Sequence, residues 1–376
     1  MSYQVLARKL RPANFDALVG QEHVVRALTH ALEAGRVHHA YLFTGTRGVG
    51  KTTIARVLAK CLNCEQGVSA KPCGTCGICR EIAEGRFVDL IEVDAASRTK
   101  VDDTRDLLDN VQYLPARGRY KVYLIDEVHM LSAASFNALL KTLEEPPEHV
   151  KFLLATTDPK KVPITVLSRC LQFQLKNLLP ERIASYLADV LTTEEIGFDT
   201  ESLDLIARAG RGSMRDALSI LDQAIAFCGG TLTADAVGEM LGTIERRELE
   251  SLLEALANAD GAALMAAADD LAERAADFRE VLAALLSVLH EMAVVQVVPE
   301  RDRGSESMVS RFAERFDAQT LQLLYQIVLL GVRDLVLAPD PRTGFEMTLL
   351  RALAFQPAGA DTDGAPTAGA PPTGAR

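Results

Sequence analysis

The chain has 376 residues, of which 48% are hydrophobic and 24% charged, and its formal net charge is −11. This length exceeds the usual size of one compact domain, so we expect two or three domains with ample buried core. The N-terminal segment MSYQVLARKLRP has no apolar run of signal length, and no stretch approaches about 18 uncharged apolar residues, which argues against secretion and against a membrane span. We therefore expect a cytoplasmic protein.

The charge is unevenly distributed along the chain. Residues 1–178 hold 24 Lys and Arg against 19 Asp and Glu, whereas residues 179–376 hold 16 against 32, and every lysine lies at or before Lys176. A basic first half can contact phosphate backbones even in an acidic protein, because the local field decides such contacts. A compositional bias toward Ala and Arg over Lys would produce the same asymmetry.

Short apolar runs alternate with helical patterns through the first half of the chain. Val24, Val25, Leu28, Ala31 and Leu32 have helical spacing within 21–35, and further helical stretches fall at 51–61, 101–112 and 134–145. Strands are expected between them, at residues 40–43, 90–93, 122–125, 152–155 and 171–173. This alternation predicts an α/β domain with a five-stranded parallel sheet covered by helices.

The strand pattern stops near Pro180, after which the sequence has helical periodicity. We expect an α/β domain at 1–178, a small helical domain at 179–242, and an all-α domain at 243–356 with apolar positions such as Leu249, Leu252 and Leu256. Residues 357–376 are rich in Pro, Gly, Ala and Thr and predict a disordered linker or tail.

A glycine-rich loop follows the first expected strand. Its spacing, G-x-x-x-x-G-K-T, is that of a P-loop, whose backbone N–H groups surround phosphates at a helix N-terminus. Lys51 would reach the β- and γ-phosphates, and the Thr52 hydroxyl would bind Mg²⁺. The expected nucleotide contacts are Gly45, Thr46, Arg47, Gly48, Val49, Gly50, Lys51, Thr52 and, directly after the loop, Thr53.

Two carboxylates at the end of the third strand complete the chemistry of an ATPase. Asp126 would hold the Mg²⁺ shell and Glu127 would polarise the attacking water, which is the reason to expect hydrolysis in addition to binding. The alternative is that both residues only begin a surface helix.

Three further residues suit stabilisation of the transferring phosphoryl group. Thr157, after the fourth strand, could orient the water; Arg169 in Ser168-Arg169-Cys170 could act as an arginine finger; and Arg215 could reach the phosphates from the helical domain. Surface salt bridges are the alternative for both arginines.

Four of the seven cysteines form a C-x8-C-x2-C-x2-C cluster, comprising Cys64, Cys73, Cys76 and Cys79. Four thiolates predict a closed, structural zinc site. Disulfides are disfavoured in a reducing cytoplasm, and an iron–sulfur cluster is a weaker alternative because the later Cys-Pro is missing. Cys61, Cys170 and Cys228 lie in apolar contexts and are expected to be buried hydrophobic residues.

These motifs together resemble the γ/τ subunits of the bacterial DNA polymerase III clamp loader, a family of AAA+ ATPases. The resemblance extends through Phe355. It depends on the P-loop, the cysteines directly after the P-loop helix, Asp126-Glu127-Val128-His129, the run 143–147 (LEEPP) and Ser168-Arg169-Cys170.

The resemblance implies an ATPase within a DNA-directed DNA polymerase complex, a nucleotidyltransferase. Several such subunits, with δ and δ′ partners, would open the ring-shaped β sliding clamp and close it around primed DNA. Arg169 would serve the neighbouring subunit's ATP, and Arg215 would sense nucleotide in its own subunit. Arg11, Pro12 and Val19 would frame the adenine.

The resemblance also assigns the third domain, 243–356, to an oligomerising collar. DNA backbone contacts would then fall to the first domain, with Arg98, Lys100 and Lys141 as candidates, although these side chains could equally be solvated charges. The end of the chain in a Gly/Ala/Pro-rich segment resembles a γ form or a truncated τ form.

Two other functions remain open at this level. Another AAA+ motor, such as a branch-migration helicase, would share the ATP site. A scaffold subunit would keep the fold and the zinc without turnover, although intact Lys51, Thr52, Asp126 and Glu127 argue against it.

Overall fold

The structure is a computed structural model that describes residues 5–97, 110–241, 246–274, 277–298, 300 and 308–355. The chain divides into two compact units, Met1–Val237 and Gly238–Arg376. The expected helix at 101–112 lies outside the described residues except for a short 3-10 helix at Asn110–Gln112, and the expected tail at 357–376 lies outside them entirely.

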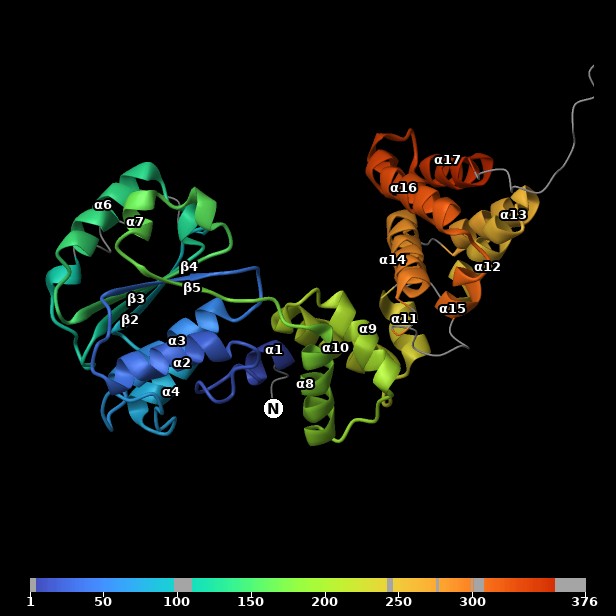
Figure 1. Ribbon diagram of the computed structural model, residues 1–376. Helices are drawn as coiled ribbons and strands as arrows, with labels where there is room; N and C mark the ends of the chain where they lie inside the picture. The colour runs from blue at the N-terminus through green and yellow to red at the C-terminus, as the bar shows by residue number, and fades with distance from the viewer. Residues whose placement is uncertain are drawn as a thin grey trace, which may run out of the picture. The chain divides into compact units, whose positions relative to one another are not determined.

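The first unit is built on a five-stranded parallel sheet (Figure 1). The strands are β1 (Ala40–Thr44), β2 (Leu90–Asp94), β3 (Lys121–Asp126), β4 (Val150–Thr156) and β5 (Leu171–Gln174). Their order across the sheet is β2-β3-β4-β1-β5, and all pairings are parallel. The predicted α/β class and all five predicted strands are confirmed.

Helices cover both faces of this sheet. Alternate residues of β1 supply the two cores, because Tyr41 and Phe43 belong to one apolar cluster and Ala40 and Leu42 to the other. On the first face pack α2 (Glu22–Glu33), α3 (Lys51–Asn63) and α4 (Gly77–Glu84); on the second pack α6 (Ala133–Glu144) and α7 (Ile164–Leu167). Burial on both faces explains why the strands are continuous apolar runs.

The sheet aligns the ends of its strands along one edge. Asp94 pairs in register with Asp126 on β2 and β3, and Thr44 pairs with Thr156 on β1 and β4. In open parallel sheets ligands bind outside the carboxyl ends of the strands. The segments that follow β1, β3 and β4 therefore meet at one place.

A helical bundle completes the first unit after the last strand. It contains α8 (Pro180–Thr193), α9 (Thr200–Ala209) and α10 (Met214–Cys228); α11 (Ala234–Leu241) follows and crosses into the second unit. Asp199 and Ser213 cap α9 and α10 by accepting backbone N–H bonds. The short N-terminal helix α1 (Leu6–Lys9) is attached to this bundle, since the Leu6 N–H donates to Asp222 at 2.7 Å.

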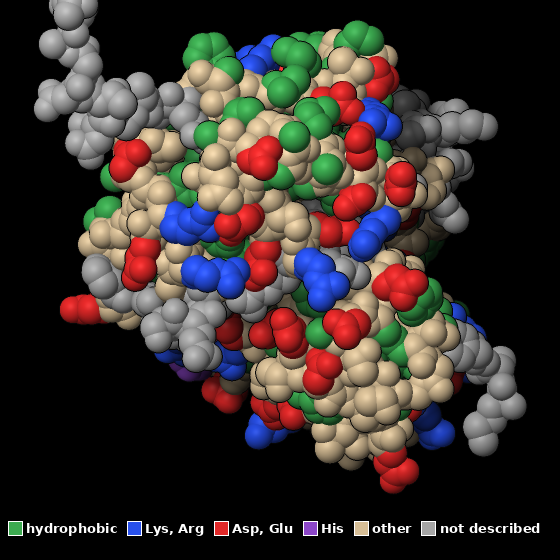
Figure 2. Space-filling model, turned by 90° about the vertical axis from the view of Figure 1, so that its right-hand side faces the viewer, with side chains coloured by type: hydrophobic (Ala, Val, Ile, Leu, Met, Phe, Trp, Pro, Cys, Tyr) green, Lys and Arg blue, Asp and Glu red, His purple; other side chains and the backbone are tan. Residues whose placement is uncertain are grey.

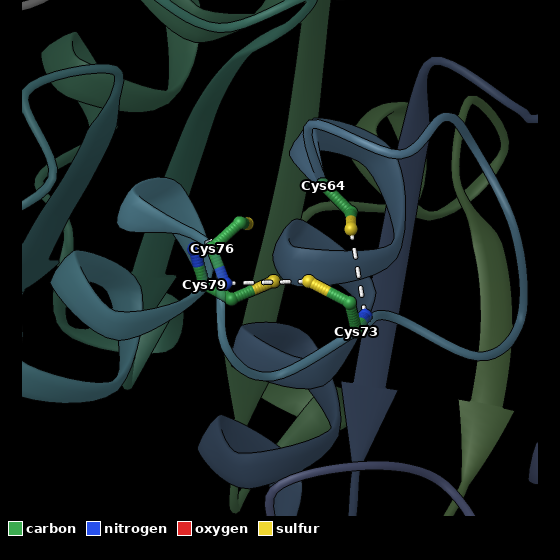
Figure 3. Close-up of side chains that lie close together, drawn as sticks. All are labelled: Cys64, Cys73, Cys76 and Cys79. Carbon is green, nitrogen blue, oxygen red and sulfur yellow. Dashed lines mark hydrogen bonds between the residues drawn. The ribbon is translucent and has the colours of Figure 1, made fainter.

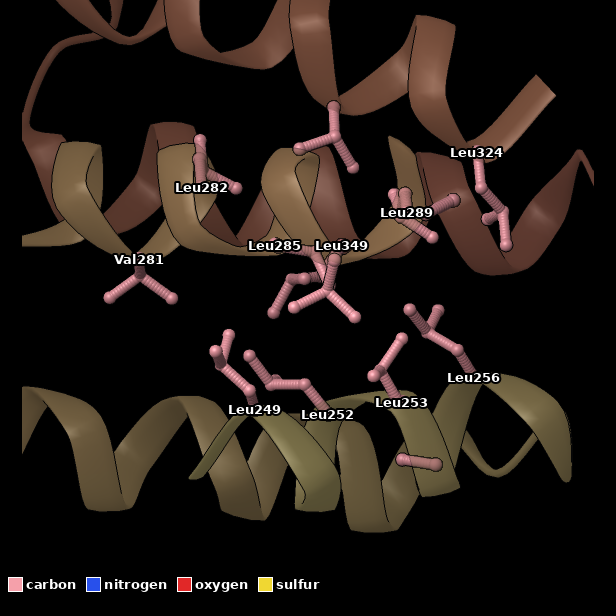
Figure 4. Packing of buried hydrophobic residues seen from close by; sticks show 14 of the residues in the cluster. Leu249, Leu252, Leu253, Leu256, Val281, Leu282, Leu285, Leu289, Leu324 and Leu349 are labelled. Atoms are coloured by element: carbon pink, nitrogen blue, oxygen red, sulfur yellow. The ribbon is translucent and has the colours of Figure 1, made fainter. Parts of the chain in front are cut away.

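The second unit is all-helical, with α12 (Arg246–Ala257), α13 (Gly261–Glu273), α14 (Phe278–Val297), α15 (Met308–Ala313), α16 (Ala318–Asp334) and α17 (Pro341–Ala354). Figure 4 shows leucines of α12 and α14 facing one another in its core, which includes Leu249, Leu252 and Leu256 as predicted. The helices α13, α14, α16 and α17 each begin at an aspartate cap, which accounts for part of the acidic composition.

Two segments of this unit, Phe278–Val297 and Ala318–Leu337, are long and apolar enough to cross a membrane by length and composition. Neither segment is an uncharged run, because each contains charged residues. Their inward side chains, such as Leu285, Leu289 and Leu324, are buried in the helical core. A core helix has the same composition as these segments, so composition alone does not indicate a span.

Charged side chains of both signs are interspersed over the face in Figure 2. In the second unit Arg315 lies 2.6 Å from Glu254, and Arg274 lies 3.0 Å from Glu248. The acidic excess of this half of the sequence is therefore partly neutralised in local pairs.

Candidate nucleotide site and cysteine cluster

The glycine-rich loop connects β1 to α3, the element order that the P-loop motif requires. Gly48 has a left-handed φ of 76°, and a Cβ at this position would lie 1.8 Å from the Ser213 hydroxyl at the start of α10. Gly50 has φ 105° and caps α3. Glycine is needed at 48 because the loop passes directly against the helical bundle.

Lys51 is 6% exposed, and its ammonium lies inside the loop. Nζ donates to the carbonyl oxygens of Gly45 and Thr46, both at 2.9 Å. Burial lowers the pKa of Lys51, although Glu127 and Asp126 oppose that shift. A buried cation with only carbonyl partners is well placed to exchange them for phosphate oxygens.

A hydroxyl and a carboxylate meet beside the loop. The Thr52 hydroxyl donates to Asp126 Oδ2 at 2.7 Å, and Asp126 is the last residue of β3. Asp94, at the end of β2, also lines the site; its carboxylate accepts from the Ala96 N–H and the Ser97 hydroxyl. Hydroxyl and carboxylate oxygens are the ligand types that Mg²⁺ prefers, so this group fits a divalent cation.

Glu127 has an uncommon backbone conformation, with φ 47°. Its Oε2 accepts from the Thr157 N–H at 3.1 Å and the Thr157 hydroxyl at 2.9 Å, and it lies 3.3 Å from His129 Nδ1. His129 Nδ1 is also 3.0 Å from the hydroxyl of buried Thr156. The segment after β4 thus fixes the carboxylate of Glu127.

These groups surround a pocket of about 510 Å³, a size typical of small-molecule sites. The P-loop from Arg47 to Lys51, with Thr52, Thr53, Asp126, Glu127 and Arg215, forms a polar end. The remaining lining is largely apolar and comes from the N-terminal segment and the helical bundle; it includes Leu10, Pro12, Leu18, Val19, Leu178, Tyr186, Met214 and Leu218. A polar end beside an apolar end suits a nucleotide.

Most of the residues expected to contact nucleotide line this pocket, including Arg11, Pro12 and Val19. Burial lowers the pKa of Arg11, and neighbouring Arg56 adds to the effect. Gly45, Thr46 and Thr157 are not among the lining residues. The Thr46 hydroxyl donates to Asn177 Oδ1 at 2.5 Å. Sequence reasoning missed Asp94 and Tyr186; the position of Asp94 at a strand end is a signal that could have identified it.

Arg169 lies outside the pocket lining of its own chain. Its guanidinium pairs with Glu144 at 2.7 Å, so the salt bridge considered as an alternative is present in the isolated chain. Arg215 lines the pocket, and its N–H lies 3.5 Å from the Gly48 carbonyl. Of the three DNA-contact candidates, Lys141 is exposed on α6, whereas Arg98 and Lys100 lie outside the described residues.

The four clustered cysteines converge between the end of α3 and the start of α4 (Figure 3). Their Sγ atoms all lie within 4.8 Å of one another. The N–H groups of Cys73, Cys76 and Cys79 each donate to the sulfur of the preceding cysteine of the cluster, at 3.3–3.4 Å. Such bonds stabilise thiolates, and the Cys76 N–H is the main reason that the pKa of Cys73 is lowered to about 6.

The donor set and its convergence fit a tetrahedral four-sulfur metal site. Cys61 is buried outside this set, with its thiol directed at the Ala70 carbonyl at 3.7 Å, and burial raises its pKa to about 12. Burial likewise raises the pKa of Cys170, to about 11. Cys61 is thus buried as predicted, whereas Cys170 and Cys228 are only partly buried.

Three family models match consecutive parts of the chain. Residues 20–179 match "DNA polymerase III, delta subunit", residues 182–230 match "DNA polymerase III clamp loader subunit, ATPase lid domain", and residues 232–360 match "DNA polymerase III subunits gamma and tau domain III".

Curated relatives match nearly the whole chain. It is 59% identical over 361 residues to DNA polymerase III subunit tau of Escherichia coli, covering 95% of this chain and 56% of that protein. It is 44% identical to DNA polymerase III subunit gamma of Buchnera aphidicola subsp. Baizongia pistaciae, covering 93% of this chain and 97% of that protein. The chain thus spans about half of the tau relative's length and almost all of the gamma relative's.

Among solved structures, the chain is similar to the Thermotoga maritima RuvB Holliday junction branch migration motor, with 21% identity, a TM-score of 0.47, and coverage of 66% of this chain and 79% of that one. That likeness is too weak to support any argument about function. The match to the gamma relative along almost its full length decides the family. The chain belongs to the gamma/tau family of DNA polymerase III subunits.

Proposed function

We propose that this chain is the ATP-hydrolysing subunit of a bacterial clamp loader, which uses ATP to open the β sliding clamp and place it on primed DNA. One observation carries the proposal. Lys51, Thr52, Asp126 and Glu127 line one pocket at the carboxyl edge of the sheet, in a chain of the gamma/tau family. A scaffold subunit would have no use for this complete set of residues.

In this proposal the P-loop binds the phosphates of ATP. The N–H groups at the start of α3 face the phosphates, and Lys51 exchanges its bonds to the Gly45 and Thr46 carbonyls for the β- and γ-phosphate oxygens. Thr52 and Asp126 would hold Mg²⁺, which neutralises charge on the phosphates. The apolar end of the pocket, with Val19 and Tyr186, would receive the adenine.

Glu127 is the proposed residue that polarises and orients the attacking water. Its contacts with Thr157 support a role for Thr157 in positioning Glu127, which refines the expectation that Thr157 orients the water itself. Arg215, on the first turn of α10, would contact the phosphates of the same chain and thereby couple the helical bundle to the nucleotide.

Arg169 is the proposed arginine finger for a neighbouring subunit. Its absence from the pocket lining of its own chain supports this assignment, because a residue that serves its own ATP would have to line that pocket. The chain would therefore act in an assembly with further copies of itself and with δ and δ′ subunits, in the cytoplasm, as part of the DNA polymerase III nucleotidyltransferase complex.

We also propose that Cys64, Cys73, Cys76 and Cys79 bind one structural zinc ion. A closed four-sulfur site leaves no position for substrate, so the metal would stabilise the connection from α3 to α4. Residues 1–178, 179–242 and 243–356 would serve as ATPase, lid and collar domains. Lys141, with Arg98 and Lys100, would contact the DNA backbone.

ATP hydrolysis by the reconstituted complex tests the proposal. The chain with δ and δ′ should hydrolyse ATP slowly alone and faster when both clamp and primed DNA are added. Strand displacement by the chain without partners would instead indicate a branch-migration motor. Absence of stimulated hydrolysis in the complete mixture would indicate a scaffold.

A further inference from the structure

Arg169 is held in a defined orientation by its own chain. Nη2 donates to Glu144 Oε1 at 2.7 Å, while Nη1 donates to the Thr165 carbonyl at 2.8 Å and the Ser168 hydroxyl at 3.4 Å. A guanidinium has five N–H donors, so these three bonds leave the rest of the fork available to another group. The side chain is 34% exposed, which keeps it accessible from outside the chain.

The carboxylate that accepts from Arg169 belongs to a firmly packed helix. Glu144 is the last residue of α6, which is capped by Ser132 at its start and anchored to the sheet through buried Leu139 and Leu143. Arg169 follows α7, which is anchored in the same apolar cluster by Val166. The bond between Arg169 and Glu144 therefore joins two elements that cannot easily move apart.

We infer that Glu144 is a positioning residue for Arg169, which fixes the guanidinium at the surface of its own chain in an orientation from which it serves a neighbouring subunit's ATP. The inference rests on the proposed role of Arg169. A free arginine samples many rotamers, and restricting them before assembly removes part of the cost of reaching the transition state. Glu144 itself touches neither nucleotide nor reacting atoms.

Because the pair is exposed, positioning of Arg169 can be distinguished from a contribution to the stability of the fold. Glu144 is 53% exposed, and exposed ion pairs contribute little to the stability of a fold. Loss of the carboxylate should therefore leave folding almost unchanged. Any substantial loss of turnover would then report on the orientation of Arg169.

The experiment compares four single variants and one double variant in the complex with δ, δ′, clamp and primed DNA. The single variants are Glu144→Ala, Glu144→Gln, Arg169→Ala and Glu145→Ala. Glu145 is the neighbouring exposed glutamate and serves as the matched control. Glu144→Ala should lower kcat for ATP about tenfold at unchanged KM and unchanged melting temperature. Glu144→Gln should restore much of the rate because its amide oxygen still accepts from Nη2, and Glu145→Ala should match the unmodified complex.

The double variant Glu144→Ala/Arg169→Ala should be no slower than Arg169→Ala alone, because Glu144 acts only through the arginine. Normal turnover in Glu144→Ala, with Arg169→Ala impaired, would overturn the inference and leave the proposed finger intact. Faster turnover in Glu144→Ala would also overturn the inference, because it would show that the ion pair keeps Arg169 away from the neighbouring subunit's ATP. Normal turnover in Arg169→Ala would instead refute the proposed function of that residue.

Discussion

The bond between Thr157 and Glu127 leads to a prediction about the rate of hydrolysis. Thr157→Val removes the hydroxyl that donates to Glu127 Oε2 at 2.9 Å and retains the N–H bond at 3.1 Å. A hydrogen bond to a charged group is worth about 1.5–3 kcal/mol. Because the Glu127 side chain is 27% exposed and keeps one of the two bonds, we use the lower value.

A loss of about 1.5 kcal/mol in the transition state corresponds to roughly a tenfold lower kcat. ATP affinity should not change, since Thr157 is not among the residues that line the pocket. The assay is steady-state ATP hydrolysis by the reconstituted complex, together with equilibrium binding of a fluorescent ATP analogue. Thr157→Ser keeps the hydroxyl and should retain most of the activity. Equal rates for Thr157→Val and the unmodified chain would show that this bond does not position Glu127.

Three further predictions concern the P-loop, the metal and the fold. Lys51→Ala should weaken ATP binding about 10- to 100-fold, because it removes a buried cation from the phosphate end; unchanged affinity in calorimetry would exclude the assigned site. Elemental analysis should find about one zinc per chain, lost in Cys76→Ser but kept in Cys228→Ser, a cysteine outside the cluster; iron with a visible chromophore would reverse the assignment. Asp89→Ala should destabilise the first unit by about 3 kcal/mol in urea unfolding, because the carboxylate is 2% exposed and accepts hydrogen bonds from the three N–H groups of residues 116–118. An unchanged unfolding midpoint would show that these bonds do not stabilise the fold.

Local sequence was sufficient to predict the sheet and the phosphate end of the pocket. The five strands are short apolar runs between helical patterns. The P-loop and Glu127 directly follow strands and Asp126 ends one, so chain order alone places them at one edge. The cysteine cluster could also be predicted from local sequence, because all four cysteines fall within sixteen residues. The structure brings their sulfurs together.

The rest of the site depends on tertiary contacts that no local pattern contains. Tyr186 reaches the pocket from α8, far along the chain from the P-loop, and in sequence it resembles any other residue of an amphipathic helix. The contact of Gly48 with Ser213 likewise depends on how the helical bundle packs against the loop. The pairing of Glu144 with Arg169 follows from the packing of α6 beside α7.

The two apolar segments of the second unit illustrate a related limit. Phe278–Val297 is apolar enough to span a membrane, yet Leu282, Leu285 and Leu289 pack into the core. Hydropathy measures how much apolar surface a helix has, whereas only the fold determines what covers that surface.

Transfer of the clamp onto DNA tests the central claim most directly. A labelled β clamp, primed circular DNA and the complete loader are mixed, and the clamp retained on the circle is measured after gel filtration. We expect retention that requires hydrolysable ATP for repeated loading, and we expect Glu127→Gln in this chain to abolish turnover. Repeated loading at an unchanged rate by the Glu127→Gln complex would contradict the claim that this chain's ATP site drives the reaction.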